Sequence, residues 1–203
     1  MSFIGYLRPL VQGRASDEPA QRRAFASLAL GFTTSAVAFY GAVHLVGATT
    51  LGSRPGTVAQ LVAVGVLAVC LIIDTGIFGL RTPMLRRQTP QQYFYRYGAA
   101  RGALLWGLDT GLVVTTFRVT SLTWASLTVT LLGLVPWWAG IAYAAGFVLP
   151  SAVFVLVVPR SSDPENAPEP VWLMDRIRDW EPWVRRSAPV LLGLTAGALL
   201  LSV

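Results

Sequence analysis

The sequence has no lysine, a single histidine and a single cysteine, and few charged residues of any kind. The one cysteine, Cys70, excludes a disulfide within the chain and a relay between two cysteines. The one histidine, His44, has no second histidine, and no cysteine or carboxylate stands at ligand spacing from it. We therefore expect no metal and no cofactor, a buried apolar role for Cys70, and a hydrogen bond from His44 to a neighbouring helix.

The shortage of charge is matched by an excess of apolar residues. Hydrophobic residues make up 54% of the 203 positions and charged residues 13%, which is too little polar surface to cover a water-soluble globule. Composition therefore predicts an integral membrane protein. The net charge is +6, but the arginines lie between apolar runs, where anionic headgroups and membrane insertion explain them. We expect a lipid bilayer and no nucleic acid as partner.

Several apolar runs approach the length of about 20 residues that a membrane-crossing helix needs. Four of them qualify or nearly qualify: 24–48, 58–80, 138–158 and 187–203. A further run, 102–135, is interrupted only by Asp109 and Arg118. As one straight helix it would measure about 50 Å, against about 30 Å for the hydrocarbon core. Either it forms two short spans that turn at Arg118, or it makes one crossing with a helix broken near "RVTSLTW".

The distribution of arginine favours the single broken crossing, because basic residues collect on the cytoplasmic side. Three segments are rich in arginine, whereas the first connection holds only Arg54; the three are 1–23, 81–101 and 159–186. If all three are cytoplasmic, 102–135 makes one net crossing. The sequence thus predicts an all-α polytopic transmembrane bundle in the cell (inner or plasma) membrane. It has five net crossings and one broken helix, with the amino end in the cytoplasm.

The segment before the last run predicts an amphipathic helix at the membrane surface. In "VWLMDRIRDWEPWVRRS" the large apolar residues share one helical stripe, and Pro182 is expected to kink or end the helix. Trp172, Trp180 and Trp183 are the expected interfacial anchors. Docking of this helix on a partner subunit is the alternative. The expected regions are an amino tail 1–23, a transmembrane bundle 24–158, a linker with the interfacial helix 159–186, and a terminal transmembrane helix 187–203.

The triplet Asp-Thr-Gly occurs twice inside apolar runs, at 74–76 and 109–111. Carboxylates within membrane segments are rare, and they mark either ion paths or structural pairs. Asp74 and Asp109 are expected at similar depth, and neither reaches an arginine along its own straight helix. We expect a buried charge network that fixes helix register; its candidate members are Asp74, Asp109, Arg118, Arg101 and His44. A proton or substrate path is the alternative.

Two further patterns have structural explanations. The triplet also occurs in aspartic proteases, but those enzymes need it at a strand-to-loop turn of a β scaffold, so we expect no hydrolytic activity and no catalytic residue. Glycine pairs four residues apart let helices approach closely and predict packing only; they are Gly98/Gly102, Gly107/Gly111 and Gly193/Gly197.

The stretch 86–134 resembles a pattern found in actinobacterial polytopic membrane proteins, with two arginines, a polar segment, a glycine-rich helix and a break. It also distantly resembles the transmembrane domain of electron carriers of the cytochrome-c-biogenesis and disulfide-reductase type. In those proteins a cysteine is expected at the break, where this chain has Arg118 in "TTFRVTSLTW". The resemblance implies a broken helix that lines a cavity, and without paired cysteines it implies no thiol chemistry.

These patterns together predict a non-enzymatic integral membrane protein. Its expected role is that of a membrane subunit or scaffold of a larger assembly, with a protein partner or further copies of itself. The alternative is a small proton- or ion-coupled transporter that uses Asp74, Asp109 and Arg118 around a water-accessible cavity. The two differ in whether these charges line a cavity or form a closed network.

Overall fold

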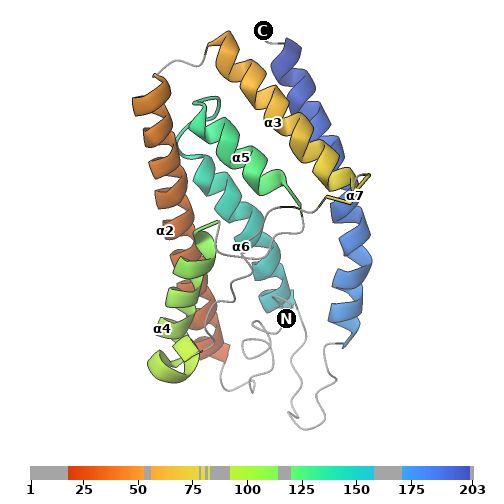
Figure 1. Ribbon diagram of the computed structural model, residues 1–203. Helices are drawn as coiled ribbons and strands as arrows, with labels where there is room; N and C mark the ends of the chain where they lie inside the picture. The colour runs from red at the N-terminus through yellow and green to blue at the C-terminus, as the bar shows by residue number, and fades with distance from the viewer. Residues whose placement is uncertain are drawn as a thin grey trace. The chain divides into compact units, whose positions relative to one another are not determined.

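The computed structural model describes residues 18–52, 56–77, 79–80, 82, 92–113, 120–157 and 171–201. Within these residues the chain forms six helices and no strand, so the prediction of an all-α fold is confirmed. The helices, shown in Figure 1, are α2 (Glu18–Leu51), α3 (Thr57–Thr75), α4 (Gln92–Gly111), α5 (Leu122–Leu131), α6 (Ala139–Val157) and α7 (Val171–Leu201).

The chain divides into two compact units, each assembled from segments far apart in sequence. Unit 1 comprises Met1–Ala36, Thr89–Leu112 and Ile141–Arg178, and unit 2 comprises Val37–Gln88, Val113–Gly140 and Asp179–Val203. Helix α4 therefore belongs to unit 1, and α3 and α5 belong to unit 2. Helices α2, α6 and α7 each contribute residues to both units.

The core of unit 1 joins the first part of α2 to α4 and α6. Leu28 of α2 and Trp106 of α4 are buried in one apolar cluster, and Phe147 of α6 packs against it. Phe32 of α2 stacks on Phe147, with ring centroids 3.9 Å apart and ring planes 4° from parallel. These stacked rings join α6 to α2 in the core of unit 1.

Glycines bring α2 and α4 into backbone contact. A Cβ at Gly107 would lie 2.9 Å from the backbone nitrogen of Phe32 and closer still to the carbonyl oxygen of Leu28. Gly111 also faces the α2 backbone, whereas a Cβ at Gly193 would meet no atom of the described residues within 4 Å. The Gly107/Gly111 pair therefore has the packing role expected of small residues between helices.

The core of unit 2 is built from α3, α5 and the later part of α7. Leu67 and Cys70 of α3, Ala125 of α5 and Leu192 of α7 form one buried cluster. Cys70 is buried among apolar side chains, as expected for a small apolar residue. Helices α3 and α5 lie side by side (Figure 1). This contact positions the polar cluster described below.

The helix boundaries agree with one predicted feature and differ from another. The run 102–135 contains the end of α4 at Gly111 and a separate helix α5, so a break is present, as both predicted alternatives require. Arg118, which was expected at that break, lies outside the described residues. Helix α7 continues through Pro182 and Pro189 from Val171 to Leu201. The expected interfacial helix and the terminal crossing therefore belong to one helix.

Two helices in the described part of the chain are long and apolar enough to cross a membrane, Arg22–Leu51 and Thr57–Thr75. The other apolar stretches whose residues are described in full are shorter: Leu122–Leu131, Ala139–Ala152 within α6 and Arg186–Leu201 within α7. The 10 residues of α5 extend only about 15 Å, half of the hydrocarbon thickness. The predicted count of five crossings is therefore not confirmed.

Candidate functional site

Both Asp-Thr-Gly triplets lie where a helix ends. Helix α3 ends at Thr75, and Gly76 follows in the left-handed conformation, with φ 69°, and donates its N–H to the carbonyl of Ile73. Helix α4 ends at Gly111. Each threonine donates its hydroxyl back to a carbonyl of its own last turn, Thr75 to Ile72 at 2.8 Å and Thr110 to Trp106 at 2.9 Å. The repeat is thus a helix-ending sequence in both places.

The carboxylate of Asp74 reaches the start of a second helix. The backbone N–H of Ser121 donates to both oxygens of Asp74, at 2.8 Å to Oδ1 and 2.9 Å to Oδ2. Ser121 is the N-cap residue of α5, and its own hydroxyl makes no capping hydrogen bond. Asp74 therefore supplies from α3 an acceptor for the N-cap N–H, the group that the N3 side chain of a capping box would otherwise bond.

A threonine completes this group, which we call the Asp74 cluster: Asp74, Thr82 and Ser121. The Thr82 hydroxyl donates to Asp74 Oδ1 at 3.4 Å and lies 3.3 Å from the Ser121 hydroxyl. Ser121 is 1% exposed and Thr82 is 9% exposed, so both polar residues are removed from the surface. The cluster joins three separate segments of unit 2, namely the end of α3, the residue Thr82 and the start of α5.

Helix dipoles explain why a carboxylate suits this position. Asp74 stands in the last turn of α3, where the negative end of that helix disfavours a carboxylate. The first turn of α5, however, presents its positive end and its unpaired N–H groups. A carboxylate between these two helix ends is stabilised only when it faces the start of α5. The hydrogen bonds from Ser121 show that the Asp74 carboxylate has this orientation.

The other members of the predicted charge network lie in different parts of the fold. Asp109 is half-buried and Arg101 is exposed, both on α4 in unit 1, whereas Asp74 belongs to unit 2. His44 is half-buried on α2, and its Nδ1 has no hydrogen-bond partner among the described residues. Arg118 lies outside those residues. Asp74 accepts hydrogen bonds from the backbone N–H of Ser121 and the hydroxyl of Thr82, whereas the sequence predicted arginine as its partner.

Sequence reasoning did not name Ser121 or Thr82. Ser121 directly precedes the apolar run of α5, which is the position that an N-cap residue takes and was a usable signal. Thr82 follows Arg81 shortly after the first triplet, and nothing local indicates its contact with Asp74.

The structure describes the side chain of one of the three predicted membrane anchors. Trp183 is 71% exposed, and the side chains of Trp172 and Trp180 lie outside the described ones. Trp137 and Trp138 are also exposed, although they were not among the predicted anchors. Exposed tryptophans are typical of the level where hydrocarbon meets the headgroups.

Among the described residues, no three His, Cys, Asp or Glu side chains gather in a way that would hold a metal ion. Comparison of the chain with protein-family models, curated proteins and solved structures finds no match. The resemblance of 86–134 to the electron carriers therefore stays a prediction, and the chemistry of the Asp74 cluster follows from its own residues.

Proposed function

We propose that this protein is a non-enzymatic, multi-pass protein of the cell membrane that serves as a membrane subunit or scaffold of a larger assembly. The membrane part of the proposal is supported by α3, whose outer face is apolar along its length. Large apolar side chains are exposed there: Val58, Leu61, Val62, Val69 and Ile72. A continuous surface of this kind is unfavourable in water and ordinary against lipid.

The choice of a scaffold is carried by the Asp74 cluster. Both oxygens of Asp74 accept the buried amide of Ser121, so this carboxylate already has a structural task. A proton or cation that bound Asp74 would compete with a hydrogen bond that holds the first turn of α5. A closed arrangement of this kind is what a scaffold needs, whereas a transporter needs its charges around water.

The alternative function is a small proton- or ion-coupled transporter that uses Asp74, Asp109 and Arg118. Asp109 favours it, because a half-buried carboxylate in an apolar helix is by default a candidate for an ion path. The Asp74→Asn variant separates the two functions, since asparagine still offers an oxygen to Ser121 but has no group that titrates. Proteoliposomes that contain wild type or Asp74→Asn would be loaded with a pH-sensitive dye. We expect no proton flux above that of empty vesicles with either protein; flux with wild type that Asp74→Asn abolishes would establish the transporter.

Assembly is tested by purification in a mild non-ionic detergent, with the mass of the protein part determined by light scattering. A mass of two or more chains, or a stoichiometric second polypeptide, is the expected result. A single chain with no companion would overturn the scaffold function.

The proposed topology has the amino end in the cytoplasm and an odd number of crossings. Because Cys70 is the only cysteine, Cys70→Ala gives a cysteine-free background. Single cysteines at Ser16→Cys and Ser202→Cys would then be treated in intact cells with a thiol reagent that does not cross membranes. We expect labelling at position 202 only. Labelling of both ends or of neither would mean an even number of crossings.

A further inference from the structure

The start of α4 is a folded-back turn held in place by two glycines. Gly98 has φ 76° and breaks the helix directly after Tyr97. The preceding turn returns to Gly102, where a Cβ would lie 2.7 Å from the carbonyl oxygen of Tyr93 and 2.8 Å from the Cα of Phe94. Tyr93 and Phe94 also pack against the apolar core of unit 1. Glycine is required at both positions, because only glycine permits this φ at 98 and this close approach at 102. The contacts of Tyr93 and Phe94 with the core hold the turn in place.

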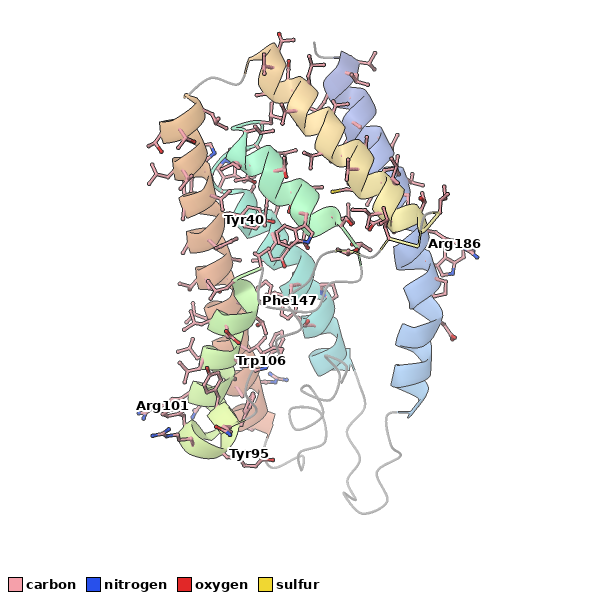
Figure 2. The ribbon with its side chains drawn as sticks, viewed as in Figure 1. Tyr40, Tyr95, Arg101, Trp106, Phe147 and Arg186 are labelled. Atoms are coloured by element: carbon pink, nitrogen blue, oxygen red, sulfur yellow. The ribbon has the colours of Figure 1, made fainter. Side chains whose placement is uncertain are left out.

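Four exposed residues at this end of α4 are called the α4 turn surface; they are Tyr95, Arg96 and Tyr97 in the turn, and Arg101 after the kink at Gly98. Tyr95 is 89% exposed and Tyr97 is 44% exposed. Both arginines are exposed, and Figure 2 labels Tyr95 and Arg101 at this end of α4, on different sides of the helix. The sequence has no acidic residue between Asp74 and Asp109, so the segment that holds these arginines carries only positive charge.

One of these arginines is already oriented. The guanidinium carbon of Arg96 lies 5.6 Å from the centroid of the Tyr97 ring, within the range of a cation–π contact. Such a contact restricts a long side chain without using its N–H donors. The donors of Arg96 therefore remain suited to an anion in the plane of the guanidinium group.

We propose that the α4 turn surface binds the headgroup of an anionic phospholipid, an inference that rests on the proposed membrane function. A guanidinium group donates two parallel N–H bonds to two oxygens of a phosphate. A tyrosine pairs an apolar ring with a hydroxyl and suits the level where lipid chains meet headgroups. The apolar part of α4 begins at Gly102, directly after Arg101, which brings both kinds of side chain to that level.

The test uses the full-length protein in a non-ionic detergent, with bound lipid counted by native mass spectrometry. Phosphatidylglycerol and phosphatidylcholine with identical chains are the probes. We expect wild type to retain phosphatidylglycerol preferentially. Arg96→Gln and Arg101→Gln should each lower that preference about fivefold, and the double variant about 30-fold. The matched control is Arg186→Gln, which removes one charge from an exposed arginine of α7 (Figure 2).

The cation–π contact between Arg96 and Tyr97 can be tested by substitutions at Tyr97 that leave the charge of the protein unchanged. Tyr97→Phe keeps the ring and should retain the preference for phosphatidylglycerol, whereas Tyr97→Leu should lower it about threefold. Equal effects of Tyr97→Phe and Tyr97→Leu on the preference would show that the Tyr97 ring does not orient Arg96 for lipid binding. A loss with Arg186→Gln as large as that of the double variant would overturn the site in favour of attraction by net charge.

Two further outcomes separate this inference from others. Displacement of phosphatidylglycerol by millimolar inorganic phosphate would overturn the lipid headgroup in favour of free phosphate. Recovery of wild type in the soluble fraction of lysed cells would refute the proposed membrane function itself. Recovery in the membrane fraction with no preference between the two lipids would refute the α4 turn surface alone.

Discussion

Removal of the Asp74 carboxylate should loosen the start of α5 more than its partial exposure suggests. In Asp74→Ala the buried Ser121 amide loses both acceptor oxygens, which lie at 2.8 and 2.9 Å. An unsatisfied buried donor costs about 1 to 3 kcal/mol, and hydrogen bonds to charged acceptors lie at the upper end, so we expect a loss of about 2 to 3 kcal/mol. Asp74→Asn keeps one oxygen for the amide but loses the charge and the second acceptor oxygen, and should cost about 1 kcal/mol.

The measurement is the free energy of unfolding of the full-length protein in mixed micelles, from an SDS titration followed by circular dichroism. Asp179→Ala is the control, because it removes an exposed aspartate from α7 and should change stability by less than about 0.5 kcal/mol. A double-mutant cycle combines Asp74→Ala with Thr82→Val and measures the coupling between the two side chains. The 3.4 Å contact is long for two oxygens, so their coupling should stay below about 0.5 kcal/mol. If Asp74→Ala matches Asp179→Ala, or Asp74→Asn costs as much as Asp74→Ala, the capping role is wrong.

Two further substitutions test the packing of each unit by the same titration. Gly107→Ala should destabilise unit 1 by about 1 to 3 kcal/mol, because its Cβ would press on the α2 backbone; Gly193→Ala, with open space around it, should be neutral or slightly stabilising. Equal effects of the two would contradict the close approach of α2 and α4. Tyr40→Phe should cost unit 2 about 1 kcal/mol, since the Tyr40 hydroxyl lies 2.6 Å from Ser126 Oγ. Ser126 gives its own proton to the carbonyl of Thr123, so Tyr40 is the donor, and an unchanged stability would show that this bond contributes nothing.

The apolar periodicity was sufficient to predict an all-α fold, because it depends on local chain physics. The sequence also predicts a helix break near "RVTSLTW" and packing by three glycine pairs, of which Gly107/Gly111 packs against another helix and Gly193/Gly197 meets no neighbouring atom among the described residues. The fold also places a helix start at Gln92, ahead of the apolar run, where an aromatic turn folds back on Gly102. This helix start depends on the contact of Gly102 with Tyr93 and Phe94 across the kink at Gly98. Hydropathy along the sequence does not predict such a contact.

The partner of Asp74 could not be predicted for a different reason. A search for residues of opposite charge to Asp74 finds arginines. At a helix start, however, the groups that need an acceptor are backbone N–H groups, which all residues except proline have. Ser121 is separated from Asp74 by 47 positions, and the two meet only because α3 packs on α5. The pairing is therefore a property of the tertiary structure, although each end of it is a recognisable local signal.

The two Asp-Thr-Gly triplets show how one short sequence takes two tasks. In both, the threonine bonds back to its own helix, which is a local effect and explains why the same two residues precede a helix end. The glycines differ, since Gly76 turns the chain with a positive φ, whereas Gly111 stays helical and admits the backbone of α2. The aspartates stand in different units, and Asp74 caps α5 in one of them. The threonines thus share a helix-ending role, whereas the glycines and the aspartates of the two triplets stand in different environments.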